Sequence, residues 1–296
     1  MAIILITGGT GLVGKQLSKI LSEKGHTIRI LSRKPTHPNS FYWNIETKEI
    51  DETAFENVDF IIHLAGAGIA DKRWTNKRKQ ELIASRTLST ALLLTTVQKL
   101  NLPLRKFIAA SAIGYYGAIN SSEVFEEDHP AASDFLASIC EQWENSSLQF
   151  EQLKIPTTII RIGIVLSDKG GALTKMNTPI AIQPIGNGDQ YIPWIHIEDL
   201  VHIFIKAVDD STFQGIYNAV APEHQTSKSF SKLLASKAGK LFIPIGVPSL
   251  MLKLLFGEMS ILLTTGSRVS SKKLRERGFH FKYQNLESAF HQIFKK

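Results

Sequence analysis

Apolar runs of strand length alternate with amphipathic stretches of helical spacing through the first two-thirds of this chain. The runs 3–6, 27–31, 58–64, 106–110 and 157–161 are short and rich in Ile, Leu, Val and Phe, which is typical of strands buried on both faces of a sheet. Helical patterns lie between them, at 17–25, 76–100 and 133–153. This alternation predicts an α/β fold, with a doubly wound parallel sheet that carries helices on both faces.

A glycine-rich turn joins the first strand to the first helix. It reads Thr-Gly-Gly-Thr-Gly-Leu-Val-Gly over residues 7–14. Its glycines allow a tight turn, a close approach of backbone N–H groups to a pyrophosphate, and close packing of the helix on the strand. In this strand–turn–helix setting the pattern indicates a Rossmann-type dinucleotide site, and a turn without a ligand is the alternative. The expected cofactor contacts are Gly8, Thr10, Gly11, Leu12, Val13 and Gly14.

The second strand ends in Ser32-Arg33-Lys34. Sites that prefer NAD place an acidic residue near this point for the ribose 2′-hydroxyl, whereas NADP sites place cations there for the 2′-phosphate. A guanidinium can form two charge-assisted hydrogen bonds with that phosphate, and a carboxylate would repel it. The alternative is that Arg33 and Lys34 are solvated turn residues before Pro35. We expect NADP(H), with Ser32, Arg33 and Lys34 in contact with it.

The character of the sequence changes near residue 167. Glycines and prolines become frequent between 170 and 193, and prolines recur at 222, 244 and 248, which predicts a loop-rich region. We expect a Rossmann domain over residues 1–166, with strands that continue to about 220. A smaller C-terminal α+β lobe on the substrate side is expected over 167–296.

Bulk composition excludes several classes of protein. The formal charge is +7 over 296 residues, but the cations are dispersed, so an anionic cofactor explains the charge better than nucleic acid does. The single cysteine, Cys140, allows no intrachain disulfide, and no His, Cys or Asp spacing indicates a metal site. The apolar stretch 250–263 is interrupted by Lys253, Gly257 and Glu258. It is therefore expected to be a buried helix or a dimer surface and not a membrane span. We expect a cytoplasmic protein without a signal peptide, and the dimer-surface alternative implies a homodimer.

The sequence resembles the extended short-chain dehydrogenase/reductase superfamily. It is most similar to an atypical branch called epimerase family proteins, which carries a C-terminal domain of unknown function, here about 243–293. The resemblance spans nearly the whole chain. The matching segments are 7–14, 32–35, 63–66, 73–75, 85–86, 111–117, 135–137, 161–166, 170–173, 194–200 and 257–279.

The resemblance implies further contacts to NADP, from residues at strand ends and on the long helix. Leu64, Ala65 and Gly66 end a strand where small residues permit close approach. The resemblance also implies that Glu81 and Arg86, on the long helix, contact NADP. Their spacing alone fits a solvated helix face equally well. Ser111 and Ile164 complete the implied set.

Catalytic members of the superfamily use a Tyr-x-x-x-Lys pair, in which the cation lowers the pKa of the phenol. Aligning Glu144 with an acid that often follows this lysine places Leu136 at the tyrosine position and Cys140 at the lysine position. An unperturbed phenol has a pKa of about 10 and needs a nearby cation to transfer a proton at neutral pH. Leu136 supplies no phenol and Cys140 supplies no cation, so this pair cannot transfer that proton. Ser111 matches the serine that orients the substrate. Either Tyr115 or Tyr116 could replace the missing proton donor, and the alternative is that both tyrosines only pack against the pocket and the core. A catalytic His196 and a nucleophilic Cys140 are weaker alternatives.

Two functions follow from this combination. The first is an NADP(H)-dependent oxidoreductase or epimerase-like enzyme that acts on an unidentified small substrate, with Ser111, Tyr115 and Tyr116 at its catalytic centre. The second is a non-catalytic NADP(H)-binding regulator, for example one related to cell division, that acts through a protein partner.

Overall fold

A computed structural model describes residues 1–295 of the chain, and its centre is one large sheet. The strand order across the sheet is β12-β8-β6-β5-β1-β2-β3-β4, and every neighbouring pair is parallel except β3 with β4. Strands β2, β3 and β4 lie on one side of β1, and β5, β6, β8 and β12 follow on its other side. The direction of the strand order therefore reverses between β1 and β5. The bounds are β1 (Ile3–Thr7), β2 (Thr27–Ser32), β3 (Ser40–Asn44), β4 (Glu49–Ile50), β5 (Phe60–His63), β6 (Lys106–Ala112), β8 (Thr157–Ile162) and β12 (Gly215–Ala219).

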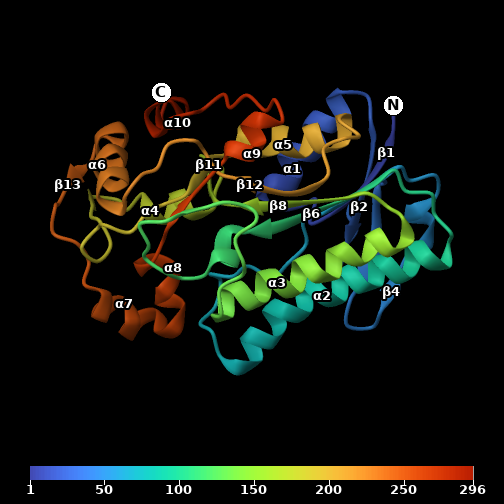
Figure 1. Cartoon of the computed structure of the whole chain (residues 1–296), viewed down its shortest axis with the longest axis horizontal. Helices are drawn as coiled ribbons and strands as arrows, with labels where there is room; N and C mark the ends of the chain where they lie inside the picture. The colour runs from blue at the N-terminus through green and yellow to red at the C-terminus, as the bar shows by residue number, and fades with distance from the viewer. Residues whose placement is uncertain (296) are drawn as a thin grey trace.

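Helices cover both faces of this sheet (Figure 1). The helices α1 (Leu12–Glu23) and α5 (Ile197–Asp209) pack together on one face, and α2 (Asn76–Lys99) and α3 (Phe135–Leu148) pack together on the other. Side chains alternate between the two cores as the pleat requires. Ile4 and Ile6 belong to the core under α1 and α5, whereas Leu5 belongs to the core under α2 and α3. The expected α/β fold with a doubly wound parallel sheet is confirmed.

The second half of the chain adds short elements at the carboxyl ends of the strands. Three pairs of short parallel strands connect it to the first half or to itself: β9 (Ile164–Leu166) with β11 (Trp194–His196), β10 (Ala181–Ile182) with β13 (Leu241–Phe242), and β7 (Val124–Phe125) with β14 (Arg268–Val269). The short helices here are α4 (Ala172–Met176), α6 (Ser227–Ala238), α7 (Ser249–Phe256), α8 (Ile261–Thr264), α9 (Lys272–Glu276) and α10 (Leu286–Ile293). Four 3₁₀ turns complete the set: η1 (Glu52–Phe55), η2 (Ile113–Tyr116), η3 (Gln149–Leu153) and η4 (Gly257–Ser260).

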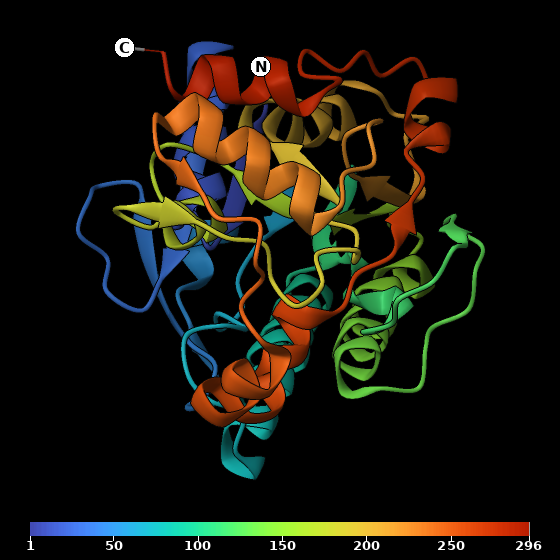
Figure 2. The ribbon, with the colours of Figure 1, turned by 90° about the vertical axis from the view of Figure 1, so that its left-hand side faces the viewer.

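The segment from α7 to α8 lies beside the first turns of α2 (Figure 2). Trp74, at the start of α2, shares a buried apolar cluster with Met259 of η4. The Lys79 ammonium pairs with the Glu258 carboxylate at 2.6 Å. The C-terminal segment therefore packs directly against α2, the helix that follows β5.

The outer face of α7 differs from what the sequence predicts. Leu252 is the one buried residue of this helix. Leu250, Met251, Leu254 and Leu255 are each more than half exposed, so the expectation of a buried helix is wrong for α7. The homodimer expected from the same stretch remains a prediction. No helix within residues 1–295 combines the length and the apolar character needed to cross a bilayer.

Candidate functional site

The glycine turn brings the start of α1 into direct contact with the end of β1. The Gly11 N–H donates to the Gly8 carbonyl at 3.0 Å, and Gly8 has a φ of +70°, which favours glycine. A Cβ added to Gly14 would collide with the Gly8 carbonyl oxygen and lie 2.6 Å from the Gly9 Cα. The helix can approach the strand this closely only because residue 14 has no side chain.

The first turn of α1 is open to an anionic ligand. Its N-cap residue, Gly11, has no side chain that could accept a hydrogen bond, and no acidic residue lies in the first turn. The first N–H groups of a helix have no partner inside it, and they lie at the positive end of its dipole. In α2 and α3 the caps are Thr75 and Asp134, which accept hydrogen bonds from backbone N–H groups. The α1 terminus thus fits a pyrophosphate group.

Ser32, Arg33 and Lys34 form a fixed turn at the end of β2. The Ser32 hydroxyl accepts from the Lys34 N–H at 3.1 Å and donates to the Lys34 carbonyl at 3.0 Å. The side chains of Arg33 and Lys34 are exposed, and they make no hydrogen bond or ion pair with any of residues 1–295. Two uncommitted cations therefore lie one strand away from the glycine turn, since β1 and β2 are neighbours.

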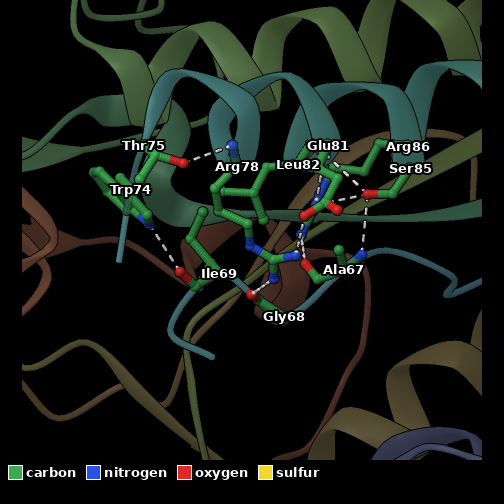
Figure 3. Close-up of polar contacts among 10 residues, drawn as sticks. All are labelled: Ala67, Gly68, Ile69, Trp74, Thr75, Arg78, Glu81, Leu82, Ser85 and Arg86. Atoms are coloured by element: carbon green, nitrogen blue, oxygen red, sulfur yellow. Dashed lines mark hydrogen bonds and ion pairs between the residues drawn. The ribbon is translucent and has the colours of Figure 1, made fainter. Parts of the chain in front are cut away.

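The loop after β5 is held by side chains from α2 and its N-terminal approach (Figure 3). The Ser85 hydroxyl accepts from the Ala67 N–H at 3.0 Å, and the Arg86 guanidinium donates to the Ala67 carbonyl at 3.1 Å. Arg78 donates to the Gly68 carbonyl at 2.7 Å, and the Trp74 indole N–H donates to the Ile69 carbonyl at 2.9 Å. Three successive residues of this loop, 67–69, are thus tied to one neighbouring helix.

Arg86 and Glu81 lie differently toward this loop. Arg86 also donates to the Leu82 carbonyl, and its guanidinium carbon lies 4.9 Å from the centre of the Trp143 ring. A Cβ on Gly66 would lie 3.1 Å from that carbon, so Arg86 contacts the loop residue expected to touch the cofactor. Glu81 is exposed and accepts from Arg78 at 2.7 Å, and this bond lowers the pKa of its carboxyl. Glu81 therefore reaches the loop only through Arg78, and cofactor contacts by Glu81 and Arg86 remain predictions.

His63 is a buried residue of the site that the sequence reasoning missed. It ends β5, next to Leu64 and Ala65, and it is fully buried. Its Nδ1 lies 2.7 Å from the Thr7 hydroxyl and its Nε2 lies 3.1 Å from the Ser89 hydroxyl. Burial lowers the pKa of His63 to about 3, so the ring is neutral and joins β1, β5 and α2. The Thr7 hydroxyl also accepts from the Ala65 N–H at 3.2 Å.

Ser111 lies in a buried polar network at the end of β6. Its hydroxyl donates to the Glu144 carboxylate of α3 at 2.6 Å. Arg161 of β8 binds the same carboxylate with two nitrogens, at 2.9 and 2.8 Å. Arg161 and Glu144 are 1% and 4% exposed, which makes this pair the charged centre of the site. Sequence reasoning did not identify it.

The same arginine binds Tyr116. Arg161 donates to the Tyr116 hydroxyl at 2.9 Å, and that hydroxyl donates to the Asn218 side-chain oxygen at 2.7 Å. Burial raises the pKa of Tyr116 to about 12, so its phenol remains protonated. The phenol proton lies in the buried hydrogen bond to Asn218.

Tyr115 also contacts the Arg161 guanidinium and is only partly buried. The Arg161 guanidinium carbon is 3.4 Å from the centre of the Tyr115 ring, a stacked cation–π contact. The Tyr115 hydroxyl has no hydrogen-bond partner among residues 1–295. Of Ser111, Tyr115 and Tyr116, it is the hydroxyl that the fold leaves available. The catalytic roles of all three remain predictions.

The helix α3 places Leu136 and Cys140 against η2, near Tyr115. A Cβ on Gly114 would lie 3.4 Å from the Cys140 sulfur and 3.6 Å from the Leu136 Cβ. Burial raises the pKa of the Cys140 thiol to about 12, and Leu136 packs in the apolar cluster that contains Trp74 and Met259. Phe135–Leu148 contains neither tyrosine nor lysine.

The remaining predicted positions lie along β9 and β11. The Ile164 N–H donates to the Pro193 carbonyl at 2.8 Å, which places Ile164 at the carboxyl end of the sheet. His196 is buried, caps α5 by accepting from the Glu198 N–H at 3.2 Å, and lies 3.1 Å from the Gln292 side-chain oxygen. Burial lowers the pKa of His196. Its contacts are those of a helix cap.

Two family models match this chain. The model of the NAD dependent epimerase/dehydratase family matches residues 4–219. The model of a domain of unknown function, DUF1731, matches residues 247–293.

Relatives match over nearly the whole length. An epimerase family protein of Staphylococcus aureus (strain MRSA252) is 35% identical over 99% of this chain and 99% of its own. The epimerase family protein SDR39U1 of Mus musculus is 31% identical over 98% of this chain and 99% of its own.

Solved structures agree with the fold. The crystal structure of human epimerase family protein SDR39U1 (isoform 2) with NADPH has a TM-score of 0.88 and 29% identity, and covers 99% of both chains. The UDP-glucose 4-epimerase of Thermus thermophilus in complex with NAD has a TM-score of 0.77 at 20% identity, with 99% and 98% covered. This second likeness concerns the fold alone.

Proposed function

We propose that this chain, which belongs to the NAD dependent epimerase/dehydratase family, uses NADP(H) in preference to NAD(H). The observation that carries the proposal is the pair of uncommitted cations, Arg33 and Lys34, one strand away from an open helix N-terminus. The human relative whose structure was obtained with NADPH gives independent support.

We infer that residues at the ends of β1, β2 and β5 would hold the cofactor. The first-turn N–H groups of α1 would bind the pyrophosphate, and Arg33 with Lys34 would bind the 2′-phosphate. The loop that begins with Leu64, Ala65 and Gly66 would lie against the nucleoside, held still by Arg78, Ser85 and Arg86. When bound, NADPH supplies a hydride for transfer to a substrate.

Cofactor preference can be measured with one substitution. Arg33→Ala removes a charge-assisted contact to the 2′-phosphate and nothing that NADH would use. We expect the Kd for NADPH to rise about tenfold. This is the lower end of the range for losing a charge-assisted hydrogen bond, because the side chain is exposed. The Kd for NADH should stay within about twofold. Arg277→Ala, at an exposed arginine beyond α9, is the control, and equal losses for both cofactors would refute the assignment.

For the reaction, we propose reduction or oxidation of a small carbonyl or hydroxyl substrate, with Tyr115 as the proton donor or acceptor. The support is its free hydroxyl beside the Arg161–Glu144 pair, where Tyr116 and Ser111 already have partners. Glu144 and Arg161 would position Tyr115 and Ser111 without touching the reacting atoms.

A panel of carbonyl compounds and nucleotide sugars, followed by NADPH absorbance, tests the reaction. Tyr115→Phe should lower kcat at least about a hundredfold, the usual range for a general acid, and leave the Kd for NADPH unchanged. If no compound turns over, or if Tyr115→Phe and Ser111→Ala are both as active as the wild type, the enzymatic proposal fails.

A non-catalytic NADP(H)-binding regulator is the second candidate. It is favoured by the apolar setting of Leu136 and Cys140 beside Gly114, two residues that we align with the superfamily's Tyr and Lys through Glu144. A pull-down with and without NADPH tests it. The expected result for a regulator is a partner whose capture changes with NADPH, and no such partner would count against this function.

A further inference from the structure

A hollow of about 350 Å³ lies between three loops at the carboxyl ends of the strands. We call it the Arg268 pocket. Hydrogen bonds link its walls: the Gly266 N–H donates to the Asn120 side-chain oxygen at 3.0 Å, and the Tyr191 N–H donates to the Gly266 carbonyl at 3.2 Å. A Cβ on Gly266 would collide with the Tyr191 carbonyl. The lining residues are Asn120, Ser121, Ser122, Asn187, Asp189, Gln190, Tyr191, Gly266 and Arg268.

Arg268 is the one cation that lines this pocket, and its charge has no partner. Its Nε is buried without a hydrogen-bond acceptor, and its side chain forms no ion pair with any residue of the described chain. The guanidinium carbon lies 5.4 Å from the centre of the Tyr191 ring, within the range of a cation–π contact. The one carboxylate in the lining, Asp189, is exposed and accepts from the Asn187 amide at 2.6 Å. Burying a charged guanidinium with an unused N–H donor costs free energy of folding, and a bound anion would offset that cost by accepting a hydrogen bond.

A histidine lies next to a residue of this pocket. The ring of His224 lies 6.4 Å from the ring of Tyr191. Burial lowers the pKa of His224, and the charge of Arg268 lowers it further. An anion bound to Arg268 would reverse the second effect.

The position of the pocket relates it to the proposed reaction centre. One wall, around Tyr191, continues to Pro193, whose carbonyl accepts from the Ile164 N–H at 2.8 Å. Another wall, 120–122, begins four residues after Tyr116. The pocket therefore opens on the same edge of the sheet as Tyr115, where ligands of such sheets bind.

We infer that the Arg268 pocket binds an oxyanion, a phosphate or a carboxylate, carried by the small-molecule substrate. Arg268 donates to it with the fork geometry that suits both groups. Tyr191 lies within cation–π distance of the guanidinium, and Asn120 and Asn187 are further polar residues of the lining. This inference rests on the proposed enzymatic function, because it names the substrate as anionic.

The first experiment measures anion binding alone. Inorganic phosphate is titrated by calorimetry into the full chain saturated with NADPH, so that the glycine turn is already filled. We expect Arg268→Gln to weaken phosphate at least about tenfold, the value of one charge-assisted bond, and Arg268→Lys to recover part of the affinity. Arg275→Gln, at an exposed arginine of α9, is the matched control. Equal phosphate affinity in the wild type and Arg268→Gln, with melting temperatures within about 2 °C, would overturn the inference.

The second experiment separates a substrate subsite from a site for free phosphate. Among carbonyl compounds that the wild type reduces, those with a phosphate or carboxylate should show a KM at least about tenfold higher in Arg268→Gln. The kcat should change by less than about twofold. Turnover of neutral compounds only, or an unchanged KM, would overturn the assignment to the substrate. If NADPH itself fails to bind, the proposed function fails, while titration of phosphate without cofactor still decides the fate of the pocket.

Discussion

Replacing Glu144 by alanine removes the acceptor around which the candidate catalytic residues are arranged. The carboxylate receives two bonds from Arg161 and one from Ser111, all between 2.6 and 2.9 Å. Without it, the Arg161 guanidinium stays 1% exposed with its charge uncompensated. Breaking a buried ion pair on one side costs about 3–5 kcal/mol. A chain of this size loses about 2 °C of Tm per kcal/mol, so we expect Tm to fall by about 6–10 °C.

Thermal melting followed by circular dichroism at pH 7 measures this loss. Glu141→Ala is the matched control, because Glu141 lies on the exposed side of the same helix and forms no ion pair within residues 1–295. The double variant Glu144→Leu with Arg161→Met removes both charges, and it should recover more than half of the lost Tm. A Glu144→Ala protein that melts within 2 °C of Glu141→Ala would show that the buried pair does not stabilise the site as argued.

Two further predictions follow from buried titratable groups. The pKa of His63 is about 3 in the folded state and about 6.5 in the unfolded chain, so its contribution to stability is complete above pH 6.5 and decreases as the pH falls toward 3. Urea unfolding at pH 7 and pH 5 should show the advantage of the wild type over His63→Gln shrinking by about 2 kcal/mol, and parallel pH profiles would contradict this. Burial raises the pKa of the Cys140 thiol to about 12, so a thiol reagent at pH 8 should label the folded protein about a thousandfold more slowly than the urea-unfolded chain. Rapid, stoichiometric labelling of the folded protein would mean that α3 does not bury this thiol.

The elements around the glycine turn were predictable because local pattern and tertiary role agree there. The runs at 3–6, 27–31 and 106–110 lie inside β1, β2 and β6, since continuous apolar strands belong at the centre of a parallel sheet. The last two strands at one side of the sheet, β3 and the edge strand β4, were missed. Ser40–Asn44 mixes aromatic and polar residues, and Glu49–Ile50 is too short to show any period.

The polar centre of the site was only partly predictable. Ser111, Tyr115 and Tyr116 were expected together because they follow one strand, but Glu144 and Arg161 come from a helix and another strand. A usable signal existed for Arg161, a charged residue within the otherwise apolar run 159–165, because such residues are almost never buried unless paired. Glu144 gave no such signal, since its neighbours in the sequence are mostly polar. Arg268 gave no comparable signal, because its isolation depends on how three distant loops meet.

The two segments matched by different family models, 4–219 and 247–293, share buried contacts. The border between them is therefore not a boundary between two independently folding parts. Residues 247–293 supply β14 as the partner of β7, and Met259 over Trp74. They also supply the Lys282 and Tyr283 N–H groups that satisfy the buried Asp199 carboxylate of α5. A chain cut after residue 246 would leave that carboxylate buried without donors and would uncover an apolar surface beside the cofactor loop. A protein that carries the first segment without the second would therefore need other donors, or an uncharged residue, at the position of Asp199, and another cover for Trp74.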